Sequence, residues 1–415
     1  MAAEQVDVLI IGAGPAGLAA AAELRRLGMP KVLVVDREAV AGGVPRMCHH
    51  IGFGMYDLRR FYSGPTYARH YVAQAEKAGA AFWPETTITG WAGPTSAQFT
   101  SPRGLGQIEA RAVLLATGCR ERPRAARLVP GSRPAGVFTT GSLQRFLYEQ
   151  HLPVGRRAVI VGAEIVSLSA FMTLGHARVP VARMVTELPG HQITFPYVGM
   201  KVWLMDMLRR TPITPEVRVT RLYGQRRVEG VELTHLTGGQ VEQVECDTVV
   251  FTGDWVPEQE LARAGGLALH EGSHGPRVDG AFRTTRPGVF AAGNVVRGAE
   301  TADVSALEGR AAAGHIARYL EGGAWPRASL PIEVEPPLEW IFPNAIAPET
   351  PLAGGFKFRV RRFCRNASVA IHQGERRLNV QRVGSVRPNW SARLDAGWVR
   401  EAALDGEPLR ATLSD

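Results

Sequence analysis

Cysteine is scarce in this sequence, and the few cysteines that occur lie far apart. The 415-residue chain contains four of them, at positions 48, 119, 246 and 364, and no two form a C-x-x-C pair. This spacing excludes a thioredoxin-type redox disulfide and a four-cysteine iron–sulfur signature within the chain. The cysteines as a set therefore point to no redox or metal centre.

Lysine and long apolar runs are scarce as well. Only four of the 48 basic residues are lysine, and the arginines are scattered rather than gathered in blocks. The net charge of +9 therefore predicts no nucleic-acid partner, and weak contact with anionic lipid fits it better. No run of about 18 uncharged apolar residues exists, so we expect no transmembrane segment. The first apolar run is too short for a signal peptide, and a cytoplasmic location is expected.

The most informative stretch begins at Val6. Apolar residues 6–11 lead into the turn GAGPAG, an alanine-rich helical segment follows, and a second apolar run ends at Asp36. Strand, glycine turn, helix, strand and acid form the dinucleotide-binding fingerprint in its required order. Gly12 permits the tight turn, Gly14 lets the backbone approach a pyrophosphate, and Gly17 lets the helix lie close on the strand. Asp36 is placed to accept a hydrogen bond from a ribose hydroxyl, and the helix N-terminus faces the phosphates.

A second unit of this kind, with altered glycines, begins at residue 158. Apolar residues 158–161 precede the turn GAEIVS, in which Glu164 and Ser167 replace the second and third glycines. A charged side chain at Glu164 stands where a pyrophosphate needs bare backbone, which argues against NAD(P)H binding. Glu187 still lies where a ribose-binding acid is expected. The strand ending at Gly253 mirrors the one ending at Gly118, which indicates a duplicated architecture.

The segment around Cys48 is the most unusual part of the first half. Cys48, His49 and His50 precede two glycines separated by Phe53, which predicts a loop that fits tightly against something. Three adjacent residues supply too few ligands for a metal, and the next histidine lies on an expected helix, so no metal site is predicted. Two interpretations stay open: a loop facing the cofactor or substrate, and ordinary packing.

Other elements follow from periodicity and caps. Ser63 should cap a helix to about Gly79, and Asp303 should open one to Leu320. The N-terminal amides of that last helix could stabilise negative charge on a reduced cofactor ring. Residues 81–91 and 97–108 resemble a strand meander, and residues 112–118 form a separate apolar strand. Beyond a proline-rich crossing at 326–337, short alternating strands predict a small β domain, which either binds a partner or packs as an appendage.

Several motifs together resemble one group of proteins. They are, in chain order, Gly12–Gly17, Gly42-Gly43, Cys48-x-His50-x-Gly52-Phe53-Gly54, Gly64-Pro65-x-Tyr67-Ala68, Gly118–Arg122, Pro130–Thr139 and Gly293-Asn294. The chain thereby resembles the FAD/NAD-type flavoprotein components of multicomponent dehydrogenases. These include the proteins associated with glycerol-3-phosphate dehydrogenase and the α-type subunits of opine oxidase, hydrogen cyanide synthase and dye-linked proline dehydrogenases. The resemblance covers nearly the whole chain.

The resemblance implies two interleaved α/β dinucleotide-binding domains, the second inserted in the first as in glutathione and thioredoxin reductases, plus a C-terminal β-rich domain. The expected boundaries are 1–124 with 263–325 for FAD, 125–262 for the NAD(P)-like domain, and 326–415 for the tail. The Asn294 position usually carries Asp, and Asn keeps an acceptor while adding a donor. The expected FAD-binding residues are Gly12, Gly14, Pro15, Ala16, Gly17, Asp36, Arg37, Gly42, Gly43, Ala116, Thr117, Gly118, Gly293, Asn294, Asp303 and Val304.

The resemblance further implies a partner-fed flavoprotein. The expected partners are a second flavoprotein of the amino-acid-oxidase type, a small iron–sulfur protein and a small-molecule substrate. The cysteine-rich cluster domain of the opine-oxidase group is absent and the second glycine motif is altered, which argues against a self-contained route from NADH. Cys48 and His50 are candidate groups beside the flavin. A free-standing NAD(P)H-dependent reductase and a non-catalytic FAD-holding scaffold are the alternatives to an electron-transferring subunit.

Overall fold

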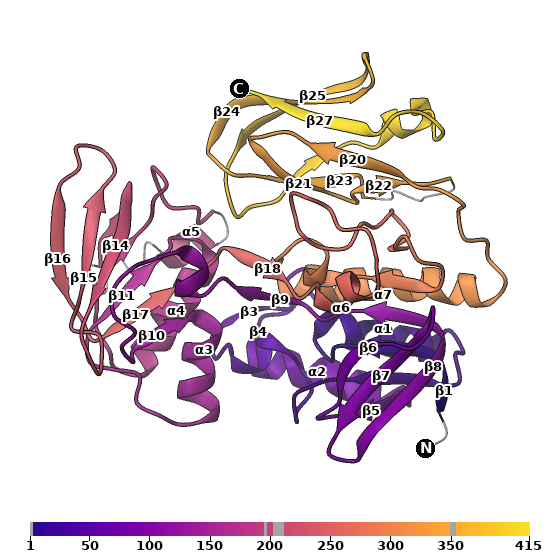
Figure 1. Ribbon diagram of the computed structural model, residues 1–415, viewed down its shortest axis with the longest axis horizontal. Helices are drawn as coiled ribbons and strands as arrows, with labels where there is room; N and C mark the ends of the chain where they lie inside the picture. Colours follow the sequence, from indigo (N-terminus) through magenta and orange to yellow (C-terminus); the bar gives the residue numbers. More distant parts are fainter. Residues whose placement is uncertain (1–2, 195–196, 202–210, 349–353) are drawn as a thin grey trace. The chain divides into compact units, whose positions relative to one another are not determined.

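The computed structural model describes residues 3–194, 197–201, 211–348 and 354–415 (Figure 1). The chain forms two compact units. The first comprises Met1–Arg46, Ile51–Cys119 and Val256–Asp415, and the second comprises Met47–His50 and Arg120–Trp255. The second unit is therefore inserted, in sequence, within the first.

The first unit is built on a seven-stranded sheet in the order β5-β2-β1-β8-β7-β6, with β19 pairing β8. The first strands run parallel, because the helices that connect them return the chain to the same edge. Its elements are β1 (Glu4–Ile11), α1 (Pro15–Arg26), β2 (Val32–Val35), β3 (Ile51–Phe53), β4 (Tyr62–Ser63), α2 (Gly64–Lys77), β5 (Ala81–Trp83), β6 (Thr87–Trp91), β7 (Ser96–Ser101), β8 (Gly104–Leu115), α6 (Glu260–Ala264), β19 (Val289–Ala291) and α7 (Ala302–Leu320).

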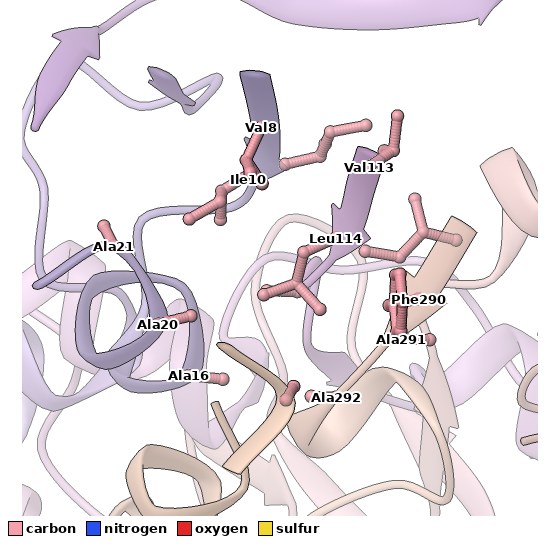
Figure 2. Close-up of a cluster of buried hydrophobic side chains, with 14 of the residues drawn as sticks. Val8, Ile10, Ala16, Ala20, Ala21, Val113, Leu114, Phe290, Ala291 and Ala292 are labelled. Carbon is pink, nitrogen blue, oxygen red and sulfur yellow. The ribbon is translucent and has the colours of Figure 1, made fainter. Parts of the chain in front are cut away.

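Small side chains let α1 lie close to this sheet and to α7. The core strands expose 0% of Val8, Leu9 and Ile10, and each such side chain contributes about 1.5–3 kcal/mol when buried. A Cβ added at Gly309 of α7 would overlap the carbonyl oxygen of Ala16, so the two helices meet backbone to backbone. Figure 2 shows this core, with β1, β8 and β19 beside the helix: Val8, Ile10, Ala16, Ala20, Ala21, Val113, Leu114, Phe290, Ala291 and Ala292.

The strand after the meander differs from the expectation. Residues 104–115 form one continuous strand, β8, where two strands ending at 108 and starting at 112 are expected. The strand pairs antiparallel with β7 along 104–109 and parallel with β1 along 108–115. It changes partners without a break, because its first half closes a hairpin while its second half is the buried centre of the parallel sheet. The expected helices are confirmed, including Ser63, whose hydroxyl accepts from the Thr66 N–H.

The C-terminal strands form two further sheets in the same unit, β22-β20-β27-β24-β25 and β21-β23-β26. They enclose a separate core around Phe356 and Trp398, whose rings stack at 5.0 Å. Figure 1 shows them in orange to yellow. Their bounds are β20 (Leu330–Val334), β21 (Leu338–Phe342), β22 (Ala345–Ile346), β23 (Phe356–Val360), β24 (Cys364–Gln373), β25 (Arg376–Val386), β26 (Ala392–Leu394) and β27 (Leu409–Ser414). The expected β-rich tail is confirmed.

The second unit repeats the nucleotide-binding plan. Its five-stranded parallel sheet has the order β10-β17-β11-β12-β13, and an antiparallel sheet β14-β15-β16 accompanies it. The elements are β10 (Val137–Thr139), α3 (Thr140–Gln144) with a π-helical turn to Glu149, β11 (Ala158–Val161), α4 (Ile165–His176), β12 (Val181–Val185), α5 (Tyr197–Lys201), β13 (Ile213–Thr214), β14 (Val217–Tyr223), β15 (Gly230–His235), β16 (Val241–Glu245) and β17 (Thr248–Phe251). Strands β9 (Cys119–Glu121) and β18 (Trp255–Pro257) lie where the chain passes between the units.

Candidate functional site

The glycine turn between β1 and α1 has the geometry that a pyrophosphate requires. Gly12 has φ +111°, and a Cβ there would overlap the Ala116 carbonyl oxygen. A Cβ at Gly17 would overlap the Gly12 carbonyl oxygen, so both positions need glycine for close packing. Gly14 differs, because an added Cβ would meet nothing within 4 Å. Gly14 is also the N-cap of α1 and provides no side-chain cap, which leaves the helix N-terminus open to an anion.

Asp36 closes the turn from the end of β2. Its carboxylate accepts from the Ala13 N–H at 2.6 Å and from the Glu38 N–H at 2.9 Å. The acid therefore holds the glycine turn in place, and a carboxylate has further lone pairs with which to accept from a ribose hydroxyl. Arg37 beside it lies 3.7 Å from Glu258 and its side chain is 63% exposed.

Two further segments border the same turn. A Cβ at Gly43 would lie 2.8 Å from Gly14 Cα, and the Gly42 N–H donates to the Ala13 carbonyl at 2.8 Å. The chain at Gly42-Gly43 is thus fastened against the turn. On the other side Thr117 donates its hydroxyl to the Glu258 carbonyl at 2.8 Å, and Gly118 has φ +79°.

Asn294 is held by the loop that follows it. Its side-chain oxygen accepts from the Glu300 N–H and from the Ser305 hydroxyl, each at 3.0 Å. Both lone pairs of that oxygen are thereby used, so the group that Asn294 has left for a ligand is its NH₂ donor. Gly293 before it has φ +78°, and a Cβ there would lie 2.9 Å from the Ala16 Cβ.

The start of α7 is engaged by a buried carboxyl cluster. Asp303, 2% exposed, accepts from the Gly54 N–H at 2.7 Å and from the Tyr56 N–H at 3.3 Å. Asp57 accepts from the hydroxyls of Tyr67 and Tyr71, each at 2.6 Å. Burial, together with the nearby Asp57 carboxyl, raises the pKa of Asp303 to about 6 although the Gly54 N–H opposes this. The Asp303 side chain thus fastens loop 54–61, while the Val304 N–H donates to the Thr301 hydroxyl cap.

Cys48 and His50 lie in the second unit, against α3 and α4. The Cys48 thiol contacts Gln144 Oε1 at 3.6 Å, and His50 Nε2 lies 2.7 Å from the Ser169 hydroxyl. Burial raises the pKa of the Cys48 thiol to about 12, so the sulfur is protonated at neutral pH. Gln144 also donates to Ser169 at 2.8 Å and joins the two contacts into one network. The segment is therefore packed and hydrogen-bonded, and its thiol lacks nucleophile character.

The altered glycine turn of the second unit is filled by its own side chain. Glu164, 4% exposed, is the N-cap of α4, and its Oε2 accepts from the Ala163 N–H at 3.0 Å. The Ser167 hydroxyl accepts from the Glu164 N–H at 3.1 Å and contacts the Thr252 hydroxyl at 2.8 Å. A carboxylate at a helix N-terminus is electrostatically favourable, because it meets the positive end of the helix dipole. At this turn an internal anion occupies the place that Gly14 leaves open at α1.

Several contacts at these sites are not predicted from the sequence. Tyr67 and Tyr71 read as the buried face of a helix, and the structure shows that their hydroxyls also serve Asp57. Glu121 follows the expected crossing strand, yet it is only 8% exposed and accepts from the Gly141 N–H at 2.9 Å. In the described ranges no cluster of three or more His, Cys, Asp or Glu side chains could hold a metal, and no helix is long and apolar enough to cross a membrane.

Two Rossmann-type sheets, one with an open glycine turn and an acid in register, define a dinucleotide-binding protein. The sequence profile of the pyridine nucleotide-disulphide oxidoreductase family matches residues 6–309, so the chain belongs to that family. The expected FAD-dependent oxidoreductase class is thereby confirmed. None of the four cysteines forms a disulfide with another, so the structure does not show the disulfide in the family's name.

Curated relatives agree with the resemblance seen in the motifs. The chain is 29% identical to the A subunit of opine oxidase from Agrobacterium tumefaciens (strain Ach5) over 327 residues, which cover 72% of this chain and 63% of that protein. It is 26% identical to the alpha subunit of sarcosine oxidase from Rhizobium meliloti (strain 1021) over 264 residues, 62% of this chain and 25% of that one. The chain thus spans less than two thirds of the length of each.

Solved structures support the fold. Thioredoxin reductase of T. acidophilum matches with a TM-score of 0.62 at 21% identity, covering 76% of this chain and 99% of that one. L-proline dehydrogenase from P. horikoshii matches with a TM-score of 0.57 at 19% identity, covering 78% and 58%. These likenesses confirm the expected α/β fold with two Rossmann-like domains.

The residues at the first turn fit FAD. The uncapped α1 N-terminus and the open space at Gly14 accommodate a pyrophosphate, and Asp36 stands at the end of β2 where a ribose would lie. When bound there, FAD supplies reversible redox chemistry that no side chain offers. The protein's own contribution is to fix the turn, through Asp36, and to order the Asn294 loop, through Glu300 and Ser305.

Proposed function

We propose that this protein is the FAD-dependent, electron-transferring subunit of a heteromeric dehydrogenase or oxidase of a small amine, amino acid or polyol. The chain would hold FAD, which would supply reversible electron transfer between a partner's flavin or the substrate and an acceptor such as a small iron–sulfur protein. Two relatives are themselves named as subunits, one of opine oxidase and one of sarcosine oxidase, which supports the heteromeric part. This electron transfer takes place in the cytoplasm.

The observation that carries the proposal is the Glu164 carboxylate at the N-terminus of α4. It donates nothing and bears negative charge, so a dinucleotide's pyrophosphate would meet both bulk and repulsion there. Because the Glu164 carboxylate fills this turn, the second unit has no site for the pyrophosphate of NAD(P)H. Electrons must therefore come to the protein from another donor.

One feature favours the alternative of an NAD(P)H-dependent reductase. Glu187, after β12, keeps the position of a ribose-binding acid in an otherwise intact Rossmann sheet. However, its carboxylate already forms an ion pair with Arg218 at 2.7 Å. A nucleotide would have to compete with that pair as well as with Glu164.

The double variant Glu164→Gly, Ser167→Gly restores the glycines of the turn and tests this explanation. We expect NADH to bind at least about tenfold more tightly, equivalent to about 1.4 kcal/mol, measured by isothermal titration calorimetry on the FAD-loaded protein. Glu164→Gln is the matched control, because it removes the charge and keeps the volume. An unchanged NADH affinity in the double variant would show that these two residues do not block the site.

Turnover distinguishes an electron-transferring subunit from a non-catalytic scaffold that only holds FAD. A scaffold would hold FAD that neither substrate nor partner reduces, whereas the FAD of an electron-transferring protein becomes reduced when partner and substrate are both present. Stopped-flow absorbance of the reconstituted complex distinguishes the two.

A further inference from the structure

Loop 54–61, between β3 and β4, presents aromatic side chains to solvent. Tyr56 is 53% exposed and Phe61 is 72% exposed. Single exposed apolar side chains are normal on protein surfaces, so neither residue alone is informative. Here, however, both lie on one short loop, and the exposed Arg59 and Arg60 lie between them in sequence. Aromatic residues and arginine are the types that carry most of the binding energy at protein interfaces.

The loop is held rigidly from its inner side. Asp303 accepts from the Gly54 and Tyr56 N–H groups, and Asp57 accepts from the hydroxyls of Tyr67 and Tyr71 on α2. These hydrogen bonds involve the backbone of the loop and Asp57, its one acidic residue. They leave the aromatic and basic side chains of the loop exposed to solvent. A surface whose shape is fixed in advance loses less conformational entropy on binding.

Arg59 also adopts a costly backbone conformation, with φ +52°. A non-glycine residue in the left-handed region is strained, and it persists there only where the surroundings impose it. The strain turns the chain between two exposed aromatic residues, in a loop that its anchors already determine.

The charge of loop 54–61 indicates which kind of partner it binds. Within the described part of the chain, neither Arg59 nor Arg60 forms an ion pair, although Arg60 contacts the Tyr62 hydroxyl at 3.4 Å. The chain carries a net charge of +9, so overall charge repulsion opposes association with a second copy. An acidic protein surface with an apolar centre complements the loop better.

We propose that loop 54–61 is the docking surface for the partner flavoprotein, and that the partner meets it with an acidic rim around an apolar pocket for Phe61. The inference rests on the proposed function, because it takes the heteromeric assembly as given and assigns its position. The loop is bonded to Asp303 in the first turn of α7, so the docked partner would contact a loop fastened to the helix expected to face the flavin.

The test uses the full-length, FAD-loaded chain, tagged and purified at low ionic strength from its native host. The partner is identified by mass spectrometry as a polypeptide with its own flavin, and its affinity for each variant is measured by biolayer interferometry. The variants are Phe61→Ser and the pair Arg59→Glu, Arg60→Glu. The matched control is Leu105→Ser, since Leu105 at the β7–β8 turn is also 72% exposed.

We expect Phe61→Ser and the charge reversal each to weaken partner binding at least tenfold, with FAD content per chain unchanged, and Leu105→Ser to bind like the wild type. Hydrogen exchange of amides 54–61 should slow in the complex. Equal binding by Phe61→Ser and wild type would overturn the docking surface while leaving the proposed function intact. Failure of the wild type to retain any flavin-bearing partner would contradict the proposed function and the docking surface with it.

Binding of anionic lipid and binding of a second copy of this chain would each give a distinct result. Either result overturns the proposal. If Phe61→Ser abolishes binding to phosphatidylglycerol vesicles but not to the partner, the loop binds anionic lipid. If it converts a wild-type dimer to a monomer in light scattering and leaves partner affinity unchanged, the loop joins two copies of this chain.

Discussion

Replacing Glu121 by Gln should change how the stability of the second unit depends on pH. Glu121 is 8% exposed and accepts from the Gly141 N–H at 2.9 Å. Burial raises the pKa of its carboxyl to about 7, the Gly141 N–H opposes the rise, and the negative charge of Glu164 adds to it. The ordinary value for the carboxyl is 4.5, so the folded chain holds this proton more tightly than the unfolded chain.

The sign of the effect follows from this difference. A carboxyl with a raised folded pKa contributes stability that is fully present below about pH 4.5 and is lost as the pH rises through about 7. The difference between the two pKa values corresponds to about 3 kcal/mol, most of which should fall between about pH 5 and about pH 8. Gln is neutral throughout, so the variant escapes this loss. Its free energy of unfolding relative to wild type should therefore rise by that amount.

Hydrogen–deuterium exchange along a urea series, read from peptides of β11, β12 and α4, reports unfolding of the second unit without requiring the whole chain to unfold in one step. Glu245→Gln, an exposed carboxylate on β16 of the same unit, controls for the loss of one charge. If the difference between Glu121→Gln and wild type is the same at both pH values, Glu121 is not the buried acid described here.

Two further predictions concern the first unit. Gly12→Ala should destabilise the fold by about 2–3 kcal/mol, because the φ of Gly12 is +111° and the added Cβ would overlap the Ala116 carbonyl oxygen. Gly14→Ala should instead melt within about 2 °C of the wild type, and its affinity for FAD should fall at least tenfold. Circular dichroism melts and bound-FAD absorbance check both, and a Gly14→Ala protein with normal FAD content would refute the phosphate position. Arg359→Met should destabilise the chain by about 3–5 kcal/mol, because it leaves Glu300 buried without its partner at 3.0 Å. The added change Glu300→Met should recover most of this loss in urea unfolding, and no recovery would show that the ion pair is not the cause.

The Arg359 contact also shows how the C-terminal strands act on the FAD loop. Although burial opposes it, the Arg359 guanidinium holds the pKa of the Glu300 carboxyl below its usual value. Ser391, also from the C-terminal part, donates to the same carboxylate. Since the Glu300 N–H donates to Asn294, the tail domain helps to order the loop expected at the flavin. Arg359→Met should therefore lower FAD retention along with stability.

Local patterns predicted much of the fold from the sequence. The sequence predicts the strand, glycine turn, helix and acid around Gly12 and Asp36, because each of them requires a particular residue type at a fixed spacing. The altered chemistry at Glu164 was readable for the same reason. The β-rich tail was visible as alternation, as in Phe356–Val360.

The remaining contacts depend on segments distant in sequence and carry no periodic signal. Asp303 meets Gly54 across 249 positions, and Cys48 meets Gln144 across 96. The motif that suggested a flavin-facing loop at Cys48 and His50 could not tell that these side chains pack on α3 and α4 of the second unit. The burial of Glu121 was equally hidden, because its motif does not show that the side chain is only 8% exposed and accepts from Gly141, 20 positions away. Such placements are decided by tertiary packing, not by local propensity.

An anaerobic absorbance titration of the FAD-loaded protein with NADH and NADPH tests the central claim most directly. We expect a flavin spectrum that neither nucleotide bleaches within the mixing time and that dithionite bleaches fully, because Glu164 fills the turn at which the nucleotide would bind while the FAD itself stays competent. Rapid bleaching by either nucleotide would contradict the account, and the protein would then be an NAD(P)H-dependent reductase.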